Sequence, residues 1–514
     1  MKSELTRREV LTGAGAALLV LGAAGPRALA ATTTAKRVSS LIGPTDSAVE
    51  SREAKRRRPG SGVVKATVTA SAIKAVVGGR EVSTWAFGAQ PSDGAIRAKV
   101  GDVVEATFVN KLPSANTLHW HGVALRNDMD GVHGLTQSAV EPGRSFVYRF
   151  IAQDAGTYWF HPHIGLELDK GLYAPLIIED PNDPVGTDVD ATLMLDDWLD
   201  GYGRTQQEIL AGLRKAGGHS MGSMGSSTAM GSSGSMGSMG SMGSMGSSGP
   251  MGSLLGDVRY PLHVINGRGP AERQTINARP GQRVRLRLIN AGSDTAYRVA
   301  VAEHRLTVTH ADGFPIRPVG VDNVALGMGE RYDVLVKAKS GAFTIAAVPE
   351  GKTDPAGEAV LRTTTTTAPP KVGSRPAGLT GKTLDYGSLV PTEAARLTTK
   401  NPTRKVTIQL TAAAKGYVHG IGGRSFPNTV PILIREGERL RVRVSNNTMM
   451  FHPIHLHGHT FQLVGSARKD TIIVPVMGAV EFDIEADNPG QWMLHCHNTY
   501  HLETGMATVL SYRR

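Results

Sequence analysis

Residues 100–110 read VGDVVEATFVN, and a closely similar stretch returns twice, as PGQRVRLRLIN at 280–290 and as EGERLRVRVSN at 436–446. Each stretch begins with a turn that contains glycine, continues with apolar residues that largely alternate with polar ones, and ends in asparagine. This alternation is typical of a β-strand with one buried face. A strand pattern that occurs three times predicts a structural unit that occurs three times.

A second pattern follows each copy and predicts two strands joined by a turn with glycine. It reads PGRSFVYRFIAQDAGTYWFHPH at 142–163, MGERYDVLVKAKSGAFTIAAV at 328–348 and MGAVEFDIEADNPGQWMLHCH at 477–497. Closely spaced strands with few helical patterns favour an all-β fold of three β-sandwich domains in tandem. We expect these domains at residues 63–182, 188–361 and 379–514, with RTTTTTAPPKVGSRPAG at 362–378 as an extended linker before the third.

The first 30 residues have the pattern of an export signal. Arg7 and Arg8 precede an apolar run that is shorter than the roughly 20 residues needed to span a bilayer, and the small residues ALA follow at 28–30. Twin arginines mark the route that exports folded proteins. We therefore expect export by this route to the cell envelope, periplasm or extracellular space, without a stable membrane anchor.

The net charge of +11 raises the question of nucleic-acid binding. The basic residues are scattered along strand-like segments, no helix-turn-helix, zinc-finger or RNA-recognition pattern occurs, and part of the excess lies in SREAKRRRPG at 51–60. This charged run predicts a flexible basic tail over residues 31–62. We expect no nucleic-acid partner, and a chain that works as a monomer.

Histidines occupy matched positions in the first and third copies. Nine and eleven residues after the final asparagine, these two copies have His119, His121, His455 and His457, whereas the second copy has valines. Five and seven residues after the turn glycine they have His161, His163, His495 and His497, whereas the second copy has alanine and valine. Residues i and i+2 of a strand share a face, so each pair presents two imidazoles together. If the first and third domains face each other, the eight histidines could hold several transition-metal ions.

The third copy carries a second group of metal-ligand side chains. Cys496, the single cysteine of the chain, stands where the first copy has proline, and His452 stands where the first copy has asparagine. His501 and Met506 follow the cysteine by five and ten residues. A thiolate, two imidazoles and a weak thioether are the ligands of a blue-copper electron-transfer site. These four residues therefore form a candidate metal site separate from the eight paired histidines.

The motifs HWHG, HPH, HPIHLHGH and HCHNTYHLETGM together resemble the four copper-binding signatures of the multicopper oxidases, the family of laccases, bilirubin oxidases and bacterial cuprous oxidases. The chain looks most like actinobacterial copper-resistance oxidases. This resemblance implies three cupredoxin-like Greek-key β-sandwiches, four copper ions per chain, and a second domain without copper.

The resemblance also implies a role for each histidine. The type 1 copper would be held by His452, Cys496, His501 and Met506. The type 2 copper would be held by His119 and His455. One type 3 copper would be held by His121, His161 and His497, and the other by His163, His457 and His495.

The residues that would serve the chemistry are Cys496, His495, His497 and Asp130. Cys496 points to one face of its strand and its two neighbours to the other, so the cysteine would connect the two metal sites. Four one-electron oxidations of substrate would then be coupled to the reduction of O₂ to water. Asp130 matches an acidic position that handles protons in the family, although an aspartate before glycine is equally typical of a tight turn. Many bacterial relatives have glutamate where this chain has Leu502, so Glu503, one residue later, is a doubtful substitute.

Residues 217–253 are nearly all glycine, serine and methionine and interrupt the second domain. Thioethers select Cu(I), whereas a flexible linker needs only glycine and serine. We expect substrate Cu(I) to contact the following methionines: Met221, Met224, Met236, Met239, Met242, Met245 and Met450.

The leading hypothesis is a cuprous oxidase that detoxifies copper, with phenols as secondary reductants. Alternatives are a laccase that acts mainly on phenols, with an inert insert, and a copper-sequestering protein without turnover. Four histidine pairs disfavour a two-domain copper nitrite reductase, whose chemistry needs no trinuclear site.

Overall fold

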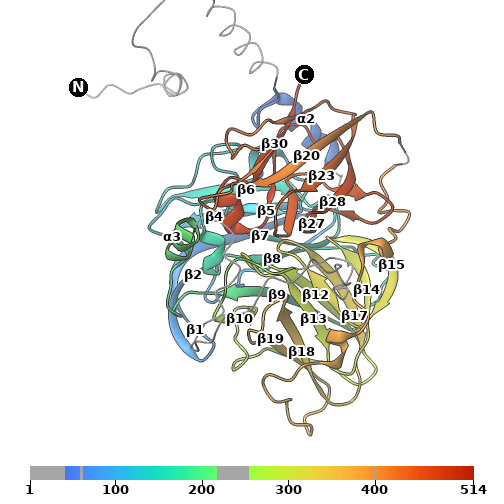
Figure 1. Ribbon diagram of the computed structural model, residues 1–514. Helices are drawn as coiled ribbons and strands as arrows, with labels where there is room; N and C mark the ends of the chain where they lie inside the picture. The colour runs from blue at the N-terminus through green and yellow to red at the C-terminus, as the bar shows by residue number, and fades with distance from the viewer. Residues whose placement is uncertain (1–40, 58–61, 217–253, 399) are drawn as a thin grey trace, which may run out of the picture. The chain divides into compact units, whose positions relative to one another are not determined.

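The computed structural model contains six β-sheets in its described residues, two for each predicted sandwich (Figure 1). The structure describes residues 41–57, 62–216, 254–398 and 400–514. The predicted signal peptide at 1–30 and the methionine-rich insert at 217–253 lie outside these ranges. The predicted all-β architecture of three sandwiches is confirmed.

The first sandwich packs two four-stranded sheets. One sheet has the order β2-β1-β4-β6, with β2 Arg80–Ala86, β1 Val63–Val77, β4 Val103–Asn110 and β6 Ser145–Ile151. The other has the order β3-β8-β7-β5, with β3 Ile96–Lys99, β8 Ala174–Glu179, β7 Gly156–His161 and β5 His119–His121.

The second sandwich packs a six-stranded sheet on a five-stranded sheet. The larger sheet contains β10 Leu262–Ile265, β9 Val189–Trp198, β12 Arg283–Asn290, β17 Arg331–Lys337, β14 Leu306–Ala311 and β15 Phe314–Val321 in that order. The smaller contains β11 Thr275–Asn277, β19 Gly357–Arg362, β18 Ala342–Pro349, β13 Tyr297–Val301 and β16 Val324–Leu326.

The third sandwich has the same two sheet sizes as the second. Its larger sheet contains β21 His419–Ile421, β20 Arg404–Ala412, β23 Arg439–Asn446, β28 Ala479–Glu485, β25 Phe461–Leu463 and β26 Arg468–Lys469. Its smaller sheet contains β22 Ile432–Ile434, β30 Ala507–Tyr512, β29 Gln491–Cys496, β24 His452–Leu456 and β27 Thr471–Val474.

The three repeated stretches occupy equivalent places in the three sandwiches. They form β4, β12 and β23, and each strand pairs in parallel with the long strand that opens its domain and antiparallel with the strand of the second pattern. The repeat seen in the sequence is therefore a repeat of topology.

The final asparagine of each repeat, Asn110, Asn290 or Asn446, is buried and closes the loop that crosses to the other sheet. In every copy its side-chain oxygen accepts a hydrogen bond from the N–H two residues later. Its amide group donates to a carbonyl four or five residues later and to a second carbonyl from a distant loop or strand. A buried amide must be satisfied in this way, which explains why asparagine ends each strand.

Each sandwich has its own hydrophobic core, and residues Ile42–Arg513 together form one compact unit. The predicted start of the third domain at residue 379 is wrong in one respect. Leu384 and Leu389 are buried in the core of the second sandwich, and the strands of the third begin with β20. The segment after the predicted linker therefore still belongs to the second domain, because its leucines complete that core.

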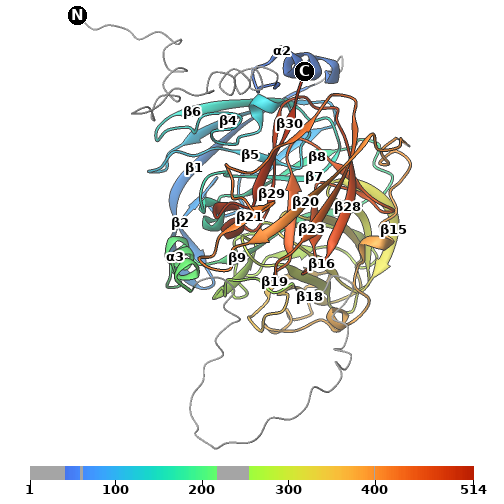
Figure 2. The same ribbon diagram turned by 45° about the horizontal axis from the view of Figure 1, so that its top comes forward.

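The prediction of a flexible tail over residues 31–62 is also wrong for part of that range. Helix α2, Ser47–Arg56, lies beside β6 and near the end of β30 (Figure 2). Val49 is buried in the core of the third sandwich, and Glu53 accepts a hydrogen bond of 3.0 Å from the main-chain N–H of Ile151 in the first. The helix thus contacts both sandwiches through Val49, Arg52 and Glu53, while Glu50 and Lys55 stay exposed.

The remaining helical segments of the described residues are short. They are α3 Gln206–Ala216 and α4 Thr499–Glu503, with 3₁₀ turns at Asn127–Met129, Glu167–Lys170, Ala377–Thr380 and Tyr386–Ser388. Within the described ranges, no helix has the length and apolar character needed to cross a bilayer.

Candidate metal centre

The four histidine pairs lie on or directly after four strands, two from the first sandwich and two from the third. Strand β5 is antiparallel to β7, with His119 opposite His161. Strand β24 is antiparallel to β29, with His455 opposite His495. The first sandwich therefore presents four imidazoles from the sheet that contains β5 and β7. The third presents four from its smaller sheet, which contains β24 and β29.

The eight imidazoles converge between the two sandwiches. Ligand atoms lie within 4.8 Å of one another in several groups of the described residues, among them His119, His121 and His455; His121, His161 and His497; and His163, His457 and His495. All eight side chains except that of His163, which is partly exposed, are buried. The predicted convergence of the first and third domains is present in the structure.

One nitrogen of several rings is held by the main chain. The Nδ1 atoms of four rings lie 2.8–3.0 Å from carbonyl oxygens, in the pairs His119–Asp130, His161–Pro162, His455–Asp470 and His495–Cys496. The Nε2 atoms of His119, His161 and His455 are buried and have no hydrogen-bond partner among the described residues. Buried polar atoms without hydrogen-bond partners call for an explanation. In a metal-ligating histidine, one ring nitrogen is held by a hydrogen bond, here Nδ1, and the other, here Nε2, is left for the metal.

Burial keeps six of these imidazoles neutral. Desolvation, followed by the charges of neighbouring histidines, lowers the pKa well below 6.5 for the following residues: His121, His161, His163, His457, His495 and His497. A neutral imidazole has the lone pair that a metal ion needs. The donor set and its protonation therefore fit transition-metal ions such as copper.

The second predicted site is assembled within the third sandwich. The Sγ atom of Cys496 lies 3.5 Å from Nδ1 of both His452 and His501, and the two Nδ1 atoms lie 3.1 Å apart. Met506 is fully buried, and its main chain bonds to those of Cys496 and His501. All four predicted type 1 ligands are thus in one place.

Cys496 and its neighbours face opposite ways, as the strand period predicts. The cysteine lies in the core of the third sandwich, whereas His495 and His497 contact histidines of the first. The two candidate sites are therefore joined by adjacent residues of one strand.

Asp130 lies at the eight-histidine cluster, as predicted. Its Oδ2 atom is 2.9 Å from Nδ1 of His457, and its Oδ1 atom is buried without a hydrogen-bond partner among the described residues. Burial raises the pKa of this carboxyl group, although His119 lowers it in part. Glu503 is an exposed residue of α4 and makes no such contact in the described part of the chain.

The second candidate site has a carboxylate that sequence reasoning missed. The Oδ2 atom of Asp257 lies 3.2 Å from Nε2 of His501 and accepts a hydrogen bond of 2.7 Å from the hydroxyl of Tyr417. Burial raises the pKa of Asp257, but the hydrogen bond and charge of His501 outweigh this and lower it. No local pattern could have found Asp257, because it lies 244 residues before His501 in the chain.

The structure also corrects one predicted Cu(I) contact. Met450 is buried, with 5% of its surface exposed, so a copper ion from solvent cannot reach it without local movement. Its neighbour Met449 is 68% exposed and replaces it as a thioether at the surface. The six predicted methionines of the insert lie outside the described residues.

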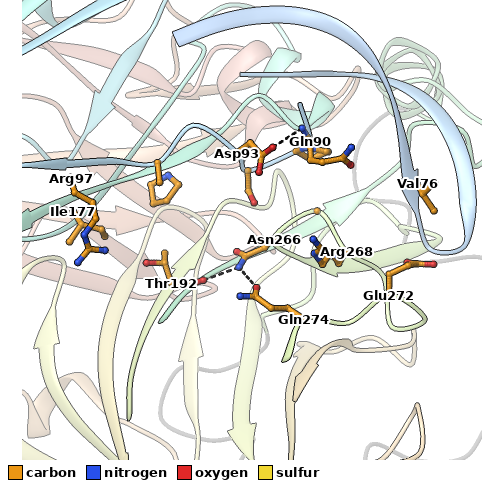
Figure 3. A pocket seen from close by; sticks show the side chains of 15 residues that line it. Val76, Gln90, Asp93, Arg97, Ile177, Thr192, Asn266, Arg268, Glu272 and Gln274 are labelled. Carbon is orange, nitrogen blue, oxygen red and sulfur yellow. Dashed lines mark hydrogen bonds between the residues drawn. The ribbon is translucent and has the colours of Figure 1, made fainter. Parts of the chain in front are cut away.

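A cleft of about 660 Å³ lies between the first and second sandwiches (Figure 3). Its polar lining includes Gln90, Asp93 and Arg97 from the first sandwich and Asn266, Arg268 and Glu272 from the second. None of the predicted site residues lines it, so the cleft is separate from the metal centre.

Comparison with known proteins agrees with this geometry. Family profiles described as multicopper oxidase match residues 69–183, 190–368 and 397–514. The chain is 40% identical over 496 residues to the multicopper oxidase MmcO of Mycobacterium tuberculosis, which covers 96% of this chain and 95% of that protein. It is 27% identical to copper resistance protein A of Escherichia coli, over 80% of this chain and 86% of that protein. Among solved structures, the laccase from Botrytis aclada is similar with a TM-score of 0.70 and 25% identity, over 88% of both chains. The chain therefore belongs to the multicopper oxidase family.

Proposed function

We propose that this chain holds four copper ions and oxidises Cu(I) to Cu(II) with O₂ as the electron acceptor. The type 1 copper is assigned to His452, Cys496, His501 and Met506. The type 2 copper is assigned to His119 and His455, and the type 3 pair to His121, His161, His497, His163, His457 and His495. The observation that carries this proposal is the convergence of eight imidazoles, among which the buried Nε2 atoms of His119, His161 and His455 have no hydrogen-bond partner among the described residues.

When bound, copper supplies one-electron transfer at the cysteine site and the reduction of O₂ at the histidine cluster. The protein links the two sites through Cys496, which is bonded directly to His495 and His497. Burial of nearly every ring of the cluster excludes bulk water from the chemistry. Asp130 is suited to hold a proton beside His457, because burial raises its pKa and one of its oxygens has no hydrogen-bond partner among the described residues.

Two observations near the cysteine site and the name of one relative support Cu(I) as the substrate. Asp257, in contact with His501, follows the end of the methionine-rich insert by only four residues. Met449, an exposed thioether, lies three residues before the ligand His452. A carboxylate and thioethers are ligands that attract a copper cation, and thioethers select Cu(I). A relative at 27% identity carries the name copper resistance protein A.

Oxygen consumption by the copper-loaded protein tests the proposal directly. We expect catalytic uptake of O₂ with Cu(I) and slower uptake with a phenol. Copper binding without O₂ turnover would instead identify a copper-sequestering protein. Phenol turnover that exceeds Cu(I) turnover would identify a laccase. A relative from Neurospora crassa at 25% identity carries that name.

Replacing the eight methionines between residues 219 and 252 by serine is expected to separate the two oxidase hypotheses. The replacement keeps the length of the insert and removes its thioethers. We expect kcat/KM for Cu(I) to fall roughly tenfold, which corresponds to about 1.4 kcal/mol of lost substrate binding, and kcat/KM for a phenol to stay unchanged. An equal change for both reductants would show that the insert does not deliver Cu(I).

Export by the twin-arginine route is part of the same proposal. A copper-oxidising enzyme would protect the cell envelope, and Arg7 and Arg8 precede the apolar run of a signal peptide. Replacing both arginines by lysine is expected to leave the protein inside the cell, as cell fractionation would measure.

A further inference from the structure

The second sandwich contributes none of the proposed copper ligands, yet one of its loops reaches the histidine cluster. Gly329 has a left-handed φ of +85° and lies against two rings. A Cβ atom at this position would be 2.8 Å from Cε1 of His121 and 3.0 Å from Cδ2 of His497. The second sandwich therefore forms part of the wall around the cluster, and only glycine fits there.

Arg331, two residues later, joins all three sandwiches. Its guanidinium group is fully buried and forms a bidentate ion pair with Asp470 of the third sandwich, at 2.6 and 2.7 Å. Its Nε–H donates to the carbonyl of Thr157 in β7 of the first sandwich, at 3.1 Å. A planar guanidinium can make these bonds at once, which a lysine ammonium cannot reproduce.

The glycine of the HWHG motif is explained by this guanidinium. Gly122 directly follows His121, and a Cβ atom there would collide with the guanidinium of Arg331 and lie 2.7 Å from Oδ2 of Asp470. The backbone next to a proposed ligand is thus shaped around the arginine.

Asp470 contacts one histidine of the first sandwich and one of the third. Its Oδ1 atom lies 3.2 Å from Nε2 of His121, and its carbonyl oxygen lies 3.0 Å from Nδ1 of His455. The hydroxyl of Thr471 donates to the same Oδ1 atom at 2.9 Å and lies 3.1 Å from Nε2 of His121. Arg331 therefore fixes the position of Asp470. The carboxylate of Asp470 contacts His121 of the first sandwich, and its main-chain carbonyl contacts His455 of the third.

Further buried charges hold this arrangement in register. Asp312 of the second sandwich accepts hydrogen bonds from the main-chain N–H groups of Arg331, Asp470 and Thr471, at 2.9–3.1 Å. Lys469 lies 3.1 Å from both Asp312 and Glu330. Buried ion pairs are costly to desolvate, so such a network is a weak source of stability and a strong constraint on relative position.

We propose that Arg331 is a positioning residue through which the second sandwich sets the spacing of His121 and His455, and so the occupancy of the type 2 and type 3 copper sites. This inference rests on the proposed function, because it requires copper in the histidine cluster. Among the described residues, the side chain of Arg331 hydrogen-bonds to Thr157, Gly329 and Asp470 and to no proposed ligand, so it acts through Asp470.

Arg331→Met tests the inference, with Arg287→Met as the matched control. Arg287 is also a buried arginine of the second sandwich, and it donates to the Thr157 side chain and pairs with Asp190 and Asp333, but it makes no bond to the third sandwich among the described residues. Copper per chain, the type 2 electron paramagnetic resonance signal and the blue absorption of the cysteine site are measured for each variant.

We expect Arg331→Met to bind type 2 copper roughly 10- to 100-fold more weakly, with a diminished or altered type 2 signal, while the blue absorption remains. Arg287→Met is expected to keep both signals. Full copper content with an unchanged type 2 signal in Arg331→Met would overturn the inference, as would equal copper loss in both variants.

Arg331→Lys decides the matter if the methionine variant does not fold. Lysine keeps the charge but lacks the planar fork that bonds both oxygens of Asp470 and the carbonyl of Thr157 at once, so we expect a folded protein with an altered type 2 signal. A lysine variant with the wild-type signal, or one that also fails to fold, would show that Arg331 serves stability alone. Absence of a type 2 signal from the wild-type protein would instead refute the proposed function.

Discussion

Cys496→Ser is expected to abolish the blue absorption and to lower O₂ consumption by more than roughly 100-fold with Cu(I) and with phenols alike. Serine offers a hard hydroxyl oxygen where copper needs a soft thiolate, so the site keeps two imidazoles and loses its electron-accepting character. The cysteine is fully buried and serine is close to it in size, so the fold should survive.

The type 2 electron paramagnetic resonance signal distinguishes loss of the cysteine site alone from unfolding of the whole protein. His495 and His497 remain in the serine variant, so the signal of the histidine cluster should persist. Met506→Leu serves as the control, since loss of a weak axial ligand changes the redox potential and leaves the thiolate in place. A serine variant that kept its blue colour and turnover would refute the type 1 assignment.

Removal of copper is expected to make the protein sensitive to mild acid. Six histidines of the cluster have pKa values well below the value of about 6.5 expected in the unfolded chain. Below that pH the unfolded chain binds protons that the folded chain cannot accept, so the free energy of unfolding falls as the pH falls. Each such histidine contributes up to about 1.4 kcal/mol per pH unit.

Thermal unfolding of the copper-free protein between about pH 7.5 and about pH 5.5 measures this effect. Buried carboxylates act in the opposite direction, because burial raises the pKa of Asp169 and Asp196 and their protonation favours the folded state as the pH falls. A single-histidine variant isolates the imidazole contribution from theirs. His161→Asn keeps a donor for the carbonyl of Pro162 and removes one titrating ring.

We expect the melting temperature of His161→Asn to depend less steeply on pH than that of the wild-type protein. His133→Asn, at an exposed histidine, should leave the slope unchanged. If His161→Asn showed the same pH dependence as the wild-type protein, burial would not be what holds the His161 imidazole neutral.

Most of the metal centre could be predicted from the sequence because its ligands are spaced by strand geometry. The offsets from the repeated asparagine place His119, His121, His455 and His457 on equivalent strands, and the period of two separates Cys496 from its neighbours. These rules are local and hold wherever the strand lies. The roles of the single histidines, and of Asp130, came from the resemblance to a family.

Errors arose where burial decides the outcome. Charged residues 51–56 looked like a solvated tail, but Val49 and the partners of Glu53 hold them as a helix. Met450 looked available for Cu(I), and its side chain lies in the interior instead. The two methionines are neighbours in the chain, and only packing distinguishes the buried one from the exposed one.

The sequence by itself therefore determined the three-sandwich architecture, the two groups of metal ligands and the absence of such ligands from the second repeat. Only the tertiary structure decided that Asp257 bonds to His501 and that Arg331 and Asp470 connect the second sandwich to the histidine cluster. The physical reason is the separation along the sequence between the residues in contact. A strand fixes the direction of its side chains over a few residues, whereas these contacts join residues at least 139 positions apart and exist only once the three sandwiches have packed.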